Sequence, residues 1–292
     1  MGNVRKEPLT LDEITRFYED GYIFPIRVLS ERQAGDLRDA LQDHLSGRIA
    51  SPKYELTDPI RIRRVTDSGE KTTFEYEDDG ITEPHTFPFL FNLWKRDERF
   101  REIGFDAVIA GMARQLLNAN QVILMEDNAV IKNPHTKTLP WHQDYSYWPL
   151  DTPTAVTVWI ALDRITPENG AMQVVPGSHK LGERLPVAFG DSSSLMQEDR
   201  PDIIEISQDP LAVGHDVVTY DLQPGECGFH HAMVWHASTP NTSSNFRHAF
   251  VLRYVANGTL WLGNERFPYD EVGVTIGDPI GGPHFPTIAT AF

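Results

Sequence analysis

The chain has 292 residues, of which 40% are hydrophobic and 23% are charged. These fractions are typical of a globular protein, and they exclude a fibrous or intrinsically disordered chain. The 42 acidic residues outnumber the 26 basic ones, and the formal net charge of −16 would repel phosphate backbones and anionic lipid headgroups. We therefore expect neither nucleic acid nor a membrane surface as a partner.

The cysteine content and the first residues bear on the compartment. Cys227 is the only cysteine, which excludes an internal disulfide framework. The opening MGNVRKEPLT lacks the apolar stretch of a secretory signal, and no run approaches the roughly 18 consecutive apolar residues of a membrane span. These features predict a cytoplasmic protein and leave its oligomeric state open.

Residues from about 9 to 120 are expected to form a helical layer. Thr10 is placed to cap a first helix that ends at Gly21, and the run YIFPIRVL follows as a short strand. Ser30 is placed to cap a second helix. The buried side of that helix is indicated by apolar residues at helical spacing, namely Ala34, Leu37, Leu41 and Leu45. The run from Phe89 to Leu117 has the spacing of core-facing helices, and we predict that it is helical.

The segment over residues 46–86 is acidic and rich in turn-forming residues. Its weak alternation fits an exposed hairpin and also a loop beside a cleft, so both interpretations stay open. A loop in this place would be positioned to act as a lid over a pocket.

From Val122 onward the sequence changes to short apolar or alternating runs, each bounded by turn-forming residues. The runs are QVILMEDNAVIKNP, TAVTVWIAL, AMQVVP, DVVTYDL, GECGFHHAMVWHAS and RHAFVLRYVA. Helices followed by strands favour a mainly β fold of the α+β class, in which an antiparallel sandwich or barrel carries N-terminal helices. We expect a single domain over residues 1–292, with a β core over about 121–256 and a C-terminal extension over 257–292.

A first candidate metal site lies in the run Trp141-His142-Gln143-Asp144. In an extended segment, residues i and i+2 project to the same face, so His142 and Asp144 can reach one metal ion while Gln143 points away. The pair is a weak signal by itself, because structural histidines outnumber metal ligands.

The second part of this candidate site lies in the run FHHAMVWHASTPNTSSNFRHAFVLRY. His236 is expected to end a strand and to face Arg247 across a PNTSSN turn. Two imidazoles and one carboxylate leave open positions on Fe(II) for a cosubstrate and O2, as in non-haem oxygenases. The Arg247 guanidinium can pair with the far carboxylate of 2-oxoglutarate, and the Ser238 hydroxyl can add a donor.

Four motifs, taken in order, resemble those of a known enzyme family. They are LTLDEITRFYEDGYIFPIRVLS, WHQDYSYW, TVWIALDRITPENGAMQVVPGSHK and FHHAMVWHASTPNTSSNFRHAFVLRY. From about Leu9 to Ala256 the chain thereby resembles the phytanoyl-CoA dioxygenase-like (PhyH) family of Fe(II)/2-oxoglutarate-dependent oxygenases. The resemblance implies a double-stranded β-helix, also called a jelly-roll or cupin-like core. It implies His142, Asp144 and His236 as iron ligands, Arg247 as the anchor of 2-oxoglutarate, and Asn128, Trp159 and Ser238 as further residues of the cosubstrate pocket.

Some candidate residues also have a simpler structural explanation. Trp159 lies in an apolar strand and can equally belong to the core. Asn128 and Lys132 share strand parity and can both point inward, but the role of Lys132 stays undecided. Arg253 shares the parity of Arg247 and can meet an anionic substrate, although a salt bridge at the rim is the simpler account.

The expected reaction is oxidation of an unactivated C–H bond in a small molecule, in the first place hydroxylation. A specialised metabolite or an amino-acid-like compound is the expected substrate. Residues placed to shape the pocket mouth are Tyr145, Tyr147 and Trp148. Asp144 argues against halogenation, because halogenating relatives resemble the hydroxylases except for a small residue at this place, which leaves room for chloride. Desaturation and ring closure stay open.

Two alternative functions are kept. One is hydroxylation of an acyl-CoA or carrier-bound substrate, although no basic cluster suited to the phosphates of CoA is apparent. The other is a metal-binding jelly-roll protein that is not an oxygenase, such as a hydrolase with a zinc-bound water. Arg247 and Ser238 discriminate against a hydrolase, because hydrolysis needs no carboxylate anchor opposite the metal.

Overall fold

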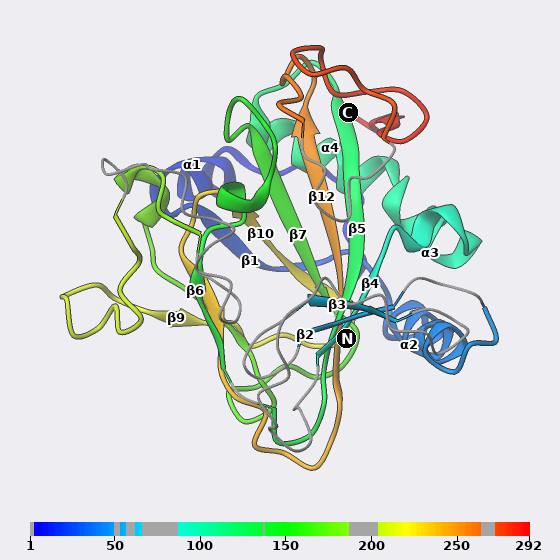
Figure 1. Ribbon diagram of the computed structural model, residues 1–292, viewed down its shortest axis with the longest axis vertical. Helices are drawn as coiled ribbons and strands as arrows, with labels where there is room; N and C mark the ends of the chain where they lie inside the picture. The colour runs from blue at the N-terminus through cyan, green and yellow to red at the C-terminus, as the bar shows by residue number, and fades with distance from the viewer. Residues whose placement is uncertain are drawn as a thin grey trace.

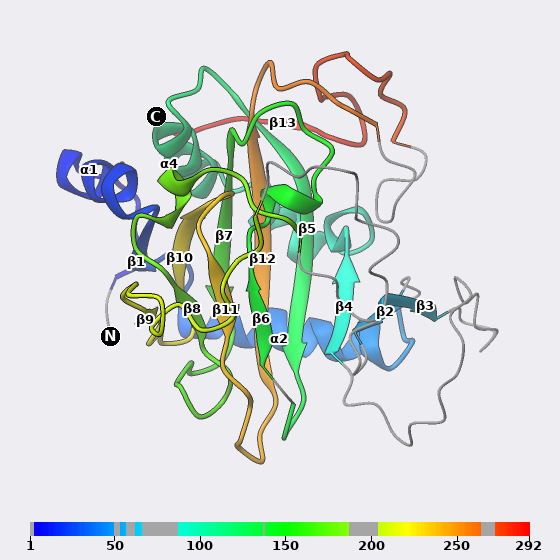
Figure 2. The same cartoon turned by 60° about the vertical axis from the view of Figure 1, so that its left-hand side comes forward.

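The computed structural model describes residues 3–49, 53–56, 62–65, 87–136, 138–186, 204–263 and 272–292. Within them, strands form two antiparallel sheets that face each other (Figures 1 and 2). The larger sheet has the order β1 (Tyr22–Arg27), β10 (Glu226–His231), β7 (Ala155–Ala161), β12 (Arg247–Ala256), β5 (Val122–Lys132), β4 (Phe87–Phe91), β2 (Lys53–Leu56) and β3 (Ile62–Val65), with β13 (Thr287–Ile288) beside β5. The smaller sheet has the order β6 (Leu139–His142), β11 (His236–Ser238), β8 (Met172–Val174) and β9 (Val218–Thr219). The fold is the predicted jelly-roll with added N-terminal helices.

The helices begin and end at local signals in the sequence. The described helices are α1 (Leu11–Asp20), α2 (Glu31–Leu45), α3 (Glu98–Gly104) and α4 (Ala107–Leu117), with single 3-10 turns η1 (Leu93–Lys95), η2 (Tyr145–Tyr147) and η3 (Ser178–Leu181). Thr10 and Ser30 each cap a helix, as predicted, and the structure adds that each does so through a reciprocal capping box. Gly21 ends α1 at φ +84°, a left-handed conformation that glycine adopts without steric cost.

The two faces of the larger sheet differ in what covers them. Helix α4 lies behind β7, β12 and β5 (Figure 1). Three even-numbered residues of β12, Phe250, Leu252 and Tyr254, are buried in the core cluster that includes residues of the helices. The odd-numbered residues Ala249 and Val251 belong to a separate cluster between the two sheets. The alternation of a β-strand therefore assigns one set of side chains to the helical layer and the other to the barrel interior.

The β5–β12 ladder fixes the polar residues of the interior. The directly opposed pairs are Lys132 and Arg247, Asn128 and Val251, and Glu126 and Arg253. Directly opposed residues of an antiparallel pair lie on the same face. A bulge follows the last pair, and Leu124 beyond it belongs to the outer cluster. The structure thus confirms the prediction that Asn128 and Lys132 both point inward. On the other side of the bulge, the even-numbered Leu124 points outward.

One predicted helix begins later than expected. The first residues of the run from Phe89 to Leu117 belong to strand β4, which pairs with β5. The periodicity of a short apolar run does not distinguish a buried strand from a helix. Here the pairing with β5 makes the segment a strand. Most of the 46–86 segment lies outside the described residues, so the prediction that it forms a lid also falls outside them. In the part of the chain that the structure describes, no helix has the length and apolar character needed to span a membrane.

Candidate metal centre

The three predicted metal ligands lie together inside the barrel. His142 ends β6, Asp144 follows it just before η2, and His236 begins β11. Their potential ligand atoms all lie within 4.8 Å of one another, and the three side chains are buried. His142 and His236 are register partners of the β6–β11 ladder, which holds the two rings side by side. Two imidazole nitrogens and one carboxylate oxygen at this spacing suit a divalent transition-metal ion.

Backbone carbonyl groups orient both imidazoles. Nδ1 of His142 donates to the carbonyl oxygen of Pro140 over 2.8 Å. Nδ1 of His236 donates to the carbonyl oxygen of Val234 over 3.0 Å. Because a carbonyl oxygen only accepts, each Nδ1 carries the proton and each Nε2 keeps its lone pair for a metal. Burial lowers the pKa of His142 to about 3 and the pKa of His236 to about 4, so both rings are neutral at pH 7.

The carboxylate of Asp144 is held from two sides. The Thr157 hydroxyl donates to Oδ2 over 2.7 Å, and Nε2 of His230 lies 3.4 Å from the same oxygen. The other oxygen, Oδ1, lies 3.7 Å from Nε2 of His236 and 3.6 Å from the Arg253 guanidinium. Oδ2 is therefore occupied by hydrogen bonding, while Oδ1 faces the imidazole that would share the metal.

Electrostatics keep Asp144 ionised. Burial alone would raise the pKa of this carboxyl, but the nearby Arg253 guanidinium and two imidazoles hold it well below its usual value. Arg253 is the main cause at neutral pH, because a guanidinium stays charged whereas the buried imidazoles are neutral. The three side chains together present two neutral nitrogens and one anionic oxygen, the protonation states that metal ligation requires.

Arg253 forms the salt bridge that the sequence suggested, and it lies against the metal centre. Its guanidinium pairs with Glu126 at 2.6 Å and lies over the Trp148 ring at 5.5 Å. Glu126 is its register partner on β5 and is buried. The arginine thus bridges a buried carboxylate and the carboxylate of Asp144.

The structure differs from the sequence-based predictions for Asp144 and His236. Asp144 has helical dihedral angles of φ −63° and ψ −43°, so it does not share a strand face with His142. The chain leaves β6 at His142 and turns, and the turn itself brings Asp144 back to the site. His236 begins a strand and does not end one. It lies in the smaller sheet and Arg247 in the larger, so no hairpin ladder pairs the two residues.

Gln143 points away from the metal centre, as expected, and its amide joins three segments. Its amide nitrogen donates to the carbonyl oxygens of Gly182 and Met233 over 3.0 and 2.8 Å. Its amide oxygen accepts from the backbone N–H of Arg184 over 2.8 Å. The residue between two candidate ligands is thus fixed to the loop after η3 and to the loop that precedes His236.

A second group of buried polar side chains, around Arg247, also lies in the barrel interior. Arg247 is only 1% exposed, and its guanidinium lies over the Trp159 ring at 5.2 Å. Within the described residues, several buried polar atoms of this region have no hydrogen-bond partner, namely Nε and one terminal nitrogen of Arg247, both amide atoms of Asn128 and the Ser238 hydroxyl. Buried polar groups are normally hydrogen-bonded, so this group of atoms marks a binding site for a polar ligand.

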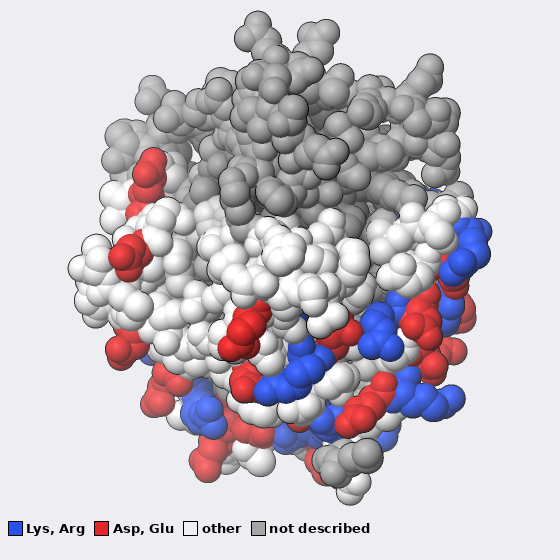
Figure 3. Space-filling view, turned by 90° about the horizontal axis from the view of Figure 1, so that it is seen from below, with Lys and Arg blue, Asp and Glu red and all other residues white. Residues whose placement is uncertain are grey.

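Electrostatics indicate the sign of that ligand. Burial lowers the pKa of Arg247 to about 9, which reflects the cost of a cation in this pocket. Its interior neighbour Lys132 is also buried, and burial together with Arg247 lowers the pKa of this lysine to about 6. On the described part of the surface in Figure 3, by contrast, acidic and basic side chains are interspersed. The surroundings of Arg247 therefore favour an anion even though the chain as a whole carries −16.

The aromatic residues expected at the pocket mouth lie close to the metal centre. The Tyr147 ring is 6.0 Å from the His142 ring in an edge-on arrangement. The Tyr145 hydroxyl donates to the carbonyl oxygen of Leu150, which makes this hydroxyl part of the local structure. Trp148 is buried beneath Arg253. A substrate role for the three remains a prediction.

Thr157 and Glu126 were missed by the sequence analysis. Thr157 has the parity of Trp159 in the run TAVTVWIAL, and this alternation was the available signal. Glu126 has the parity of Asn128, so an inward-facing carboxylate was also readable. The partners of Thr157 and Glu126 could not be predicted from the sequence, because the contacts to Asp144 and Arg253 join different segments of the chain.

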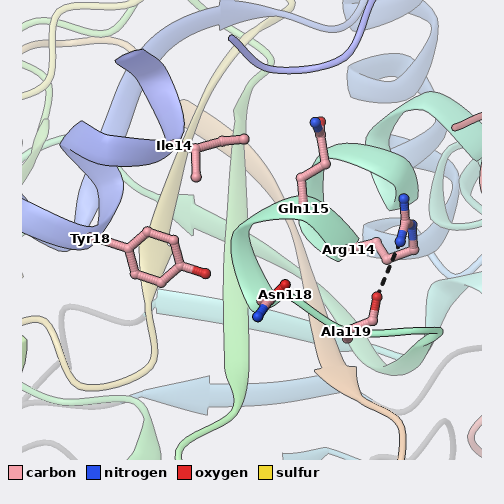
Figure 4. A pocket seen from close by; sticks show the side chains of 6 residues that line it. All are labelled: Ile14, Tyr18, Arg114, Gln115, Asn118 and Ala119. Atoms are coloured by element: carbon pink, nitrogen blue, oxygen red, sulfur yellow. Dashed lines mark hydrogen bonds between the residues drawn. The ribbon is translucent and has the colours of Figure 1, made fainter. Parts of the chain in front are cut away.

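A depression on the outer side of the molecule has no ligand assigned to it. It is lined by residues of α1 and α4 and of the turn that follows, and Figure 4 labels Ile14, Tyr18, Arg114, Gln115, Asn118 and Ala119. Arg114 donates to the carbonyl oxygens of Ala119 and Phe292, and the Gln115 amide oxygen accepts from the backbone N–H of Leu9. These polar groups hold the helices and the C-terminus together.

Comparison with known proteins agrees with this geometry. The family described as Phytanoyl-CoA dioxygenase (PhyH) matches residues 17–249. A phytanoyl-CoA dioxygenase from Arabidopsis thaliana is 25% identical over 270 residues, covering 87% of this chain and 91% of the relative. Among solved structures, the non-heme alpha ketoglutarate dependent carbocyclase SnoK from nogalamycin biosynthesis has a TM-score of 0.72 at 23% identity and covers 96% of each chain.

A second solved structure is described with ligands. The epimerase SnoN, in complex with Fe3+, alpha ketoglutarate and nogalamycin RO, has a TM-score of 0.70 at 20% identity and covers 94% of this chain and 97% of its own. At these identities both structures establish the shared fold. The match to the family over most of the length identifies this chain as a member of the phytanoyl-CoA dioxygenase (PhyH) family.

Proposed function

We propose that this protein is an Fe(II)- and 2-oxoglutarate-dependent oxygenase that oxidises a C–H bond of a small molecule, in the first place by hydroxylation. The observation that carries the proposal is the position of two sites in one barrel interior. A buried cluster of two imidazoles and a carboxylate shares the interior with a buried arginine and a set of unpartnered polar atoms. Family membership and the iron and alpha ketoglutarate bound by SnoN support the choice of metal and cosubstrate.

The residues fit the metal. His142 and His236 would bind it through Nε2, since Nδ1 of each ring is used by a carbonyl. Asp144 would bind it through Oδ1 while Thr157 holds Oδ2. Iron bound there would supply the oxidising power, with 2-oxoglutarate and O2 as co-reactants. The protein contributes the position of the ligands and the exclusion of water from a buried site.

The residues also fit the cosubstrate. 2-Oxoglutarate is a dianion, and its far carboxylate would pair with the Arg247 guanidinium. The Ser238 hydroxyl and the Asn128 amide would satisfy further oxygens, which would give their unpartnered atoms hydrogen bonds. Trp159 would form an apolar wall beside the arginine.

Hydroxylation is preferred to halogenation because the carboxylate of Asp144 is present and is held by Thr157. SnoK is a carbocyclase and SnoN is an epimerase, which supports keeping ring closure and related oxidations as further outcomes of the same site. The substrate is proposed to be a small molecule, with aromatic residues such as Tyr147 beside it. A single-domain organisation over the whole chain belongs to the same proposal.

The metal and cosubstrate are tested first by anaerobic titration. Addition of Fe(II) and then 2-oxoglutarate to the purified protein should produce a weak visible charge-transfer band. Arg247→Met should weaken 2-oxoglutarate binding by about 100-fold, because a buried charge-assisted pair is lost. The proposal would be wrong if the protein bound zinc tightly and showed no such band, and if the native protein and Arg247→Met had the same affinity for 2-oxoglutarate. The protein would then be a metal-binding jelly-roll of another function.

The reaction is tested by screening small molecules for substrate-stimulated formation of succinate, followed by mass spectrometry of the product. A gain of one oxygen atom would identify hydroxylation, and a loss of two hydrogens would identify desaturation or ring closure. A chlorinated product from the native protein with chloride present would contradict the role given to Asp144.

A further inference from the structure

Four polar side chains form a row across the inner face of the larger sheet. Glu126 of β5 is the register partner of Arg253 of β12. Arg253 is also the partner of Thr157 on β7, which in turn pairs with His230 on β10. Directly opposed residues lie on the same face of a sheet, so the four side chains point the same way. The row therefore crosses four neighbouring strands on the side that holds the metal centre.

Three members of this row contact the carboxylate of Asp144. The Thr157 hydroxyl and Nε2 of His230 lie 2.7 and 3.4 Å from Oδ2. One terminal nitrogen of Arg253, Nη2, lies 3.6 Å from Oδ1. The other, Nη1, pairs with Glu126 over 2.6 Å. The guanidinium thus lies between two carboxylates, one of which belongs to a candidate metal ligand.

The ion pair of Glu126 and Arg253 is shielded from water. Glu126 is 2% exposed, and the side chain of Arg253 is 13% exposed. Charges in such surroundings are weakly screened, so an unbalanced charge would act strongly on a neighbouring dication. As a pair the two side chains carry no net charge. A metal ion held by Asp144 would therefore meet a balanced pair and not a lone cation.

The position of the guanidinium also matters for Asp144. Charge-assisted hydrogen bonds between a guanidinium and a carboxylate measure about 2.7–2.9 Å. The contact of Arg253 with Glu126 is as short as such a bond, whereas the 3.6 Å contact with Asp144 is longer. Glu126 thereby holds the guanidinium away from a close pair with Oδ1, which leaves this oxygen for a metal.

Building on the proposed function, we propose that Glu126 is a positioning residue of the metal centre and that it acts through Arg253. It balances the charge of the arginine beside the metal and restrains the guanidinium from binding Oδ1 of Asp144. The arginine can then offset the charge of Asp144 in the metal-free protein without competing with the metal. Thr157 and His230 hold the other oxygen, so the row as a whole leaves one oxygen available.

The alternative is an ion pair that only joins β5 to β12. Arg27 and Glu226 provide the comparison, because they are register partners on β1 and β10 and form an equivalent salt bridge at 3.0 Å. Glu226 precedes His230 by four residues, which corresponds to about 13 Å along the strand. Glu226→Gln therefore removes a carboxylate from a matched pair in the same sheet, away from the metal centre.

The experiment measures Co(II) binding to the metal-free protein by calorimetry at about pH 8, where protons compete little for carboxylates. Glu126→Gln should weaken binding by about 10- to 100-fold, the range for residues that support metal ligands. Arg253→Gln removes the cation and keeps the carboxylate, so it should bind Co(II) at least as tightly as the native protein. The double variant Glu126→Gln/Arg253→Gln restores the charge balance and should bind Co(II) within about threefold of the native protein. Glu226→Gln should leave the affinity within about twofold.

Thermal unfolding of each variant shows whether it is folded before the titration. Native Co(II) affinity in Glu126→Gln, or a double variant that binds as weakly as Glu126→Gln, would overturn the role of Glu126 and leave the proposed function intact. Weaker binding by Arg253→Gln would overturn the charge balance in the same way. Failure of the native protein to bind Co(II) would overturn the metal centre, and with it both the proposed function and the role of Glu126.

Discussion

The two faces of β12 show how this protein separates stability from function. Phe250, Leu252 and Tyr254 point outward, are buried in apolar contacts, and the Tyr254 hydroxyl donates to the Gly104 carbonyl oxygen over 2.9 Å. Arg247 and Arg253 point inward, where one has unpartnered nitrogens and the other lies beside Asp144. The outward face gains stability from apolar packing and from a hydrogen bond to its polar group. The inward face keeps polar groups available for a ligand, and this lowers the stability of the fold.

The largest effect is expected from removal of a ligand on the inner side. Asp144→Ala should weaken Fe(II) or Co(II) binding by more than about 100-fold, because residues that merely orient ligands already contribute 10- to 100-fold. Calorimetric titration of the metal-free protein measures the loss, with Asp36→Ala on the exposed side of α2 as the charge control. Unchanged metal affinity would place the metal elsewhere.

On the outer face the expected loss is in folding. Leu252→Ala should lower the free energy of unfolding by about 2–5 kcal/mol, since it leaves a cavity beneath the helices at a residue with no exposed surface. Metal affinity of the folded protein should not change. Urea unfolding and metal titration of the same sample measure both. A large fall in metal affinity with little loss of stability would break the distinction between the faces.

A smaller effect on stability is expected from pH, through an outward histidine of β10. Nδ1 of His231 accepts from the backbone N–H of Met233 over 3.1 Å, and burial lowers the pKa of His231 to about 4. As the pH falls, His231 of the unfolded chain binds a proton near pH 6.5, whereas His231 of the folded chain binds one only near pH 4. Stability should therefore fall as the pH drops from about 6.5 to 4, by at most about 1.4 kcal/mol per pH unit for this group. Thermal unfolding of the metal-free protein across this range measures it, and His231→Gln should flatten the profile.

The smallest effect concerns the orientation of Asp144. Thr157→Val keeps the side-chain shape and removes the hydroxyl that donates to Oδ2. Metal affinity should fall by about tenfold, the lower range for a lost supporting contact. Thr154→Val, one residue before the same strand, is a matched control, because its hydroxyl bonds Thr259. Equal metal affinity in both variants would mean that packing alone fixes the carboxylate.

Local features could be predicted from the sequence wherever neighbouring residues carry the information. The capping boxes at Thr10 and Ser30 and the glycine at the end of α1 act within a few residues, so the helix ends were readable. The parity of Asn128 and Lys132 was readable for the same reason. The prediction of a helix from Phe89 was wrong for its first residues, because these residues pair with β5 as a strand.

The candidate site shows the same division. The residue types His142, Asp144, His236 and Arg247 could be named from the motifs. The assumed geometry was wrong, because Asp144 lies in a turn after β6 and because His236 and Arg247 belong to opposite sheets. No spacing along the chain encodes a contact between two sheets.

The sequence by itself determined the family, the periodicity of each element and the chemical groups available to a metal and a carboxylate. The tertiary structure alone decided which groups meet. It placed Thr157 and Arg253 against Asp144, joined the loops around Gln143, and buried Lys132 opposite Arg247. The physical reason is that side-chain periodicity is a local property of the backbone, whereas convergence depends on strand register, one bulge and the packing of two sheets.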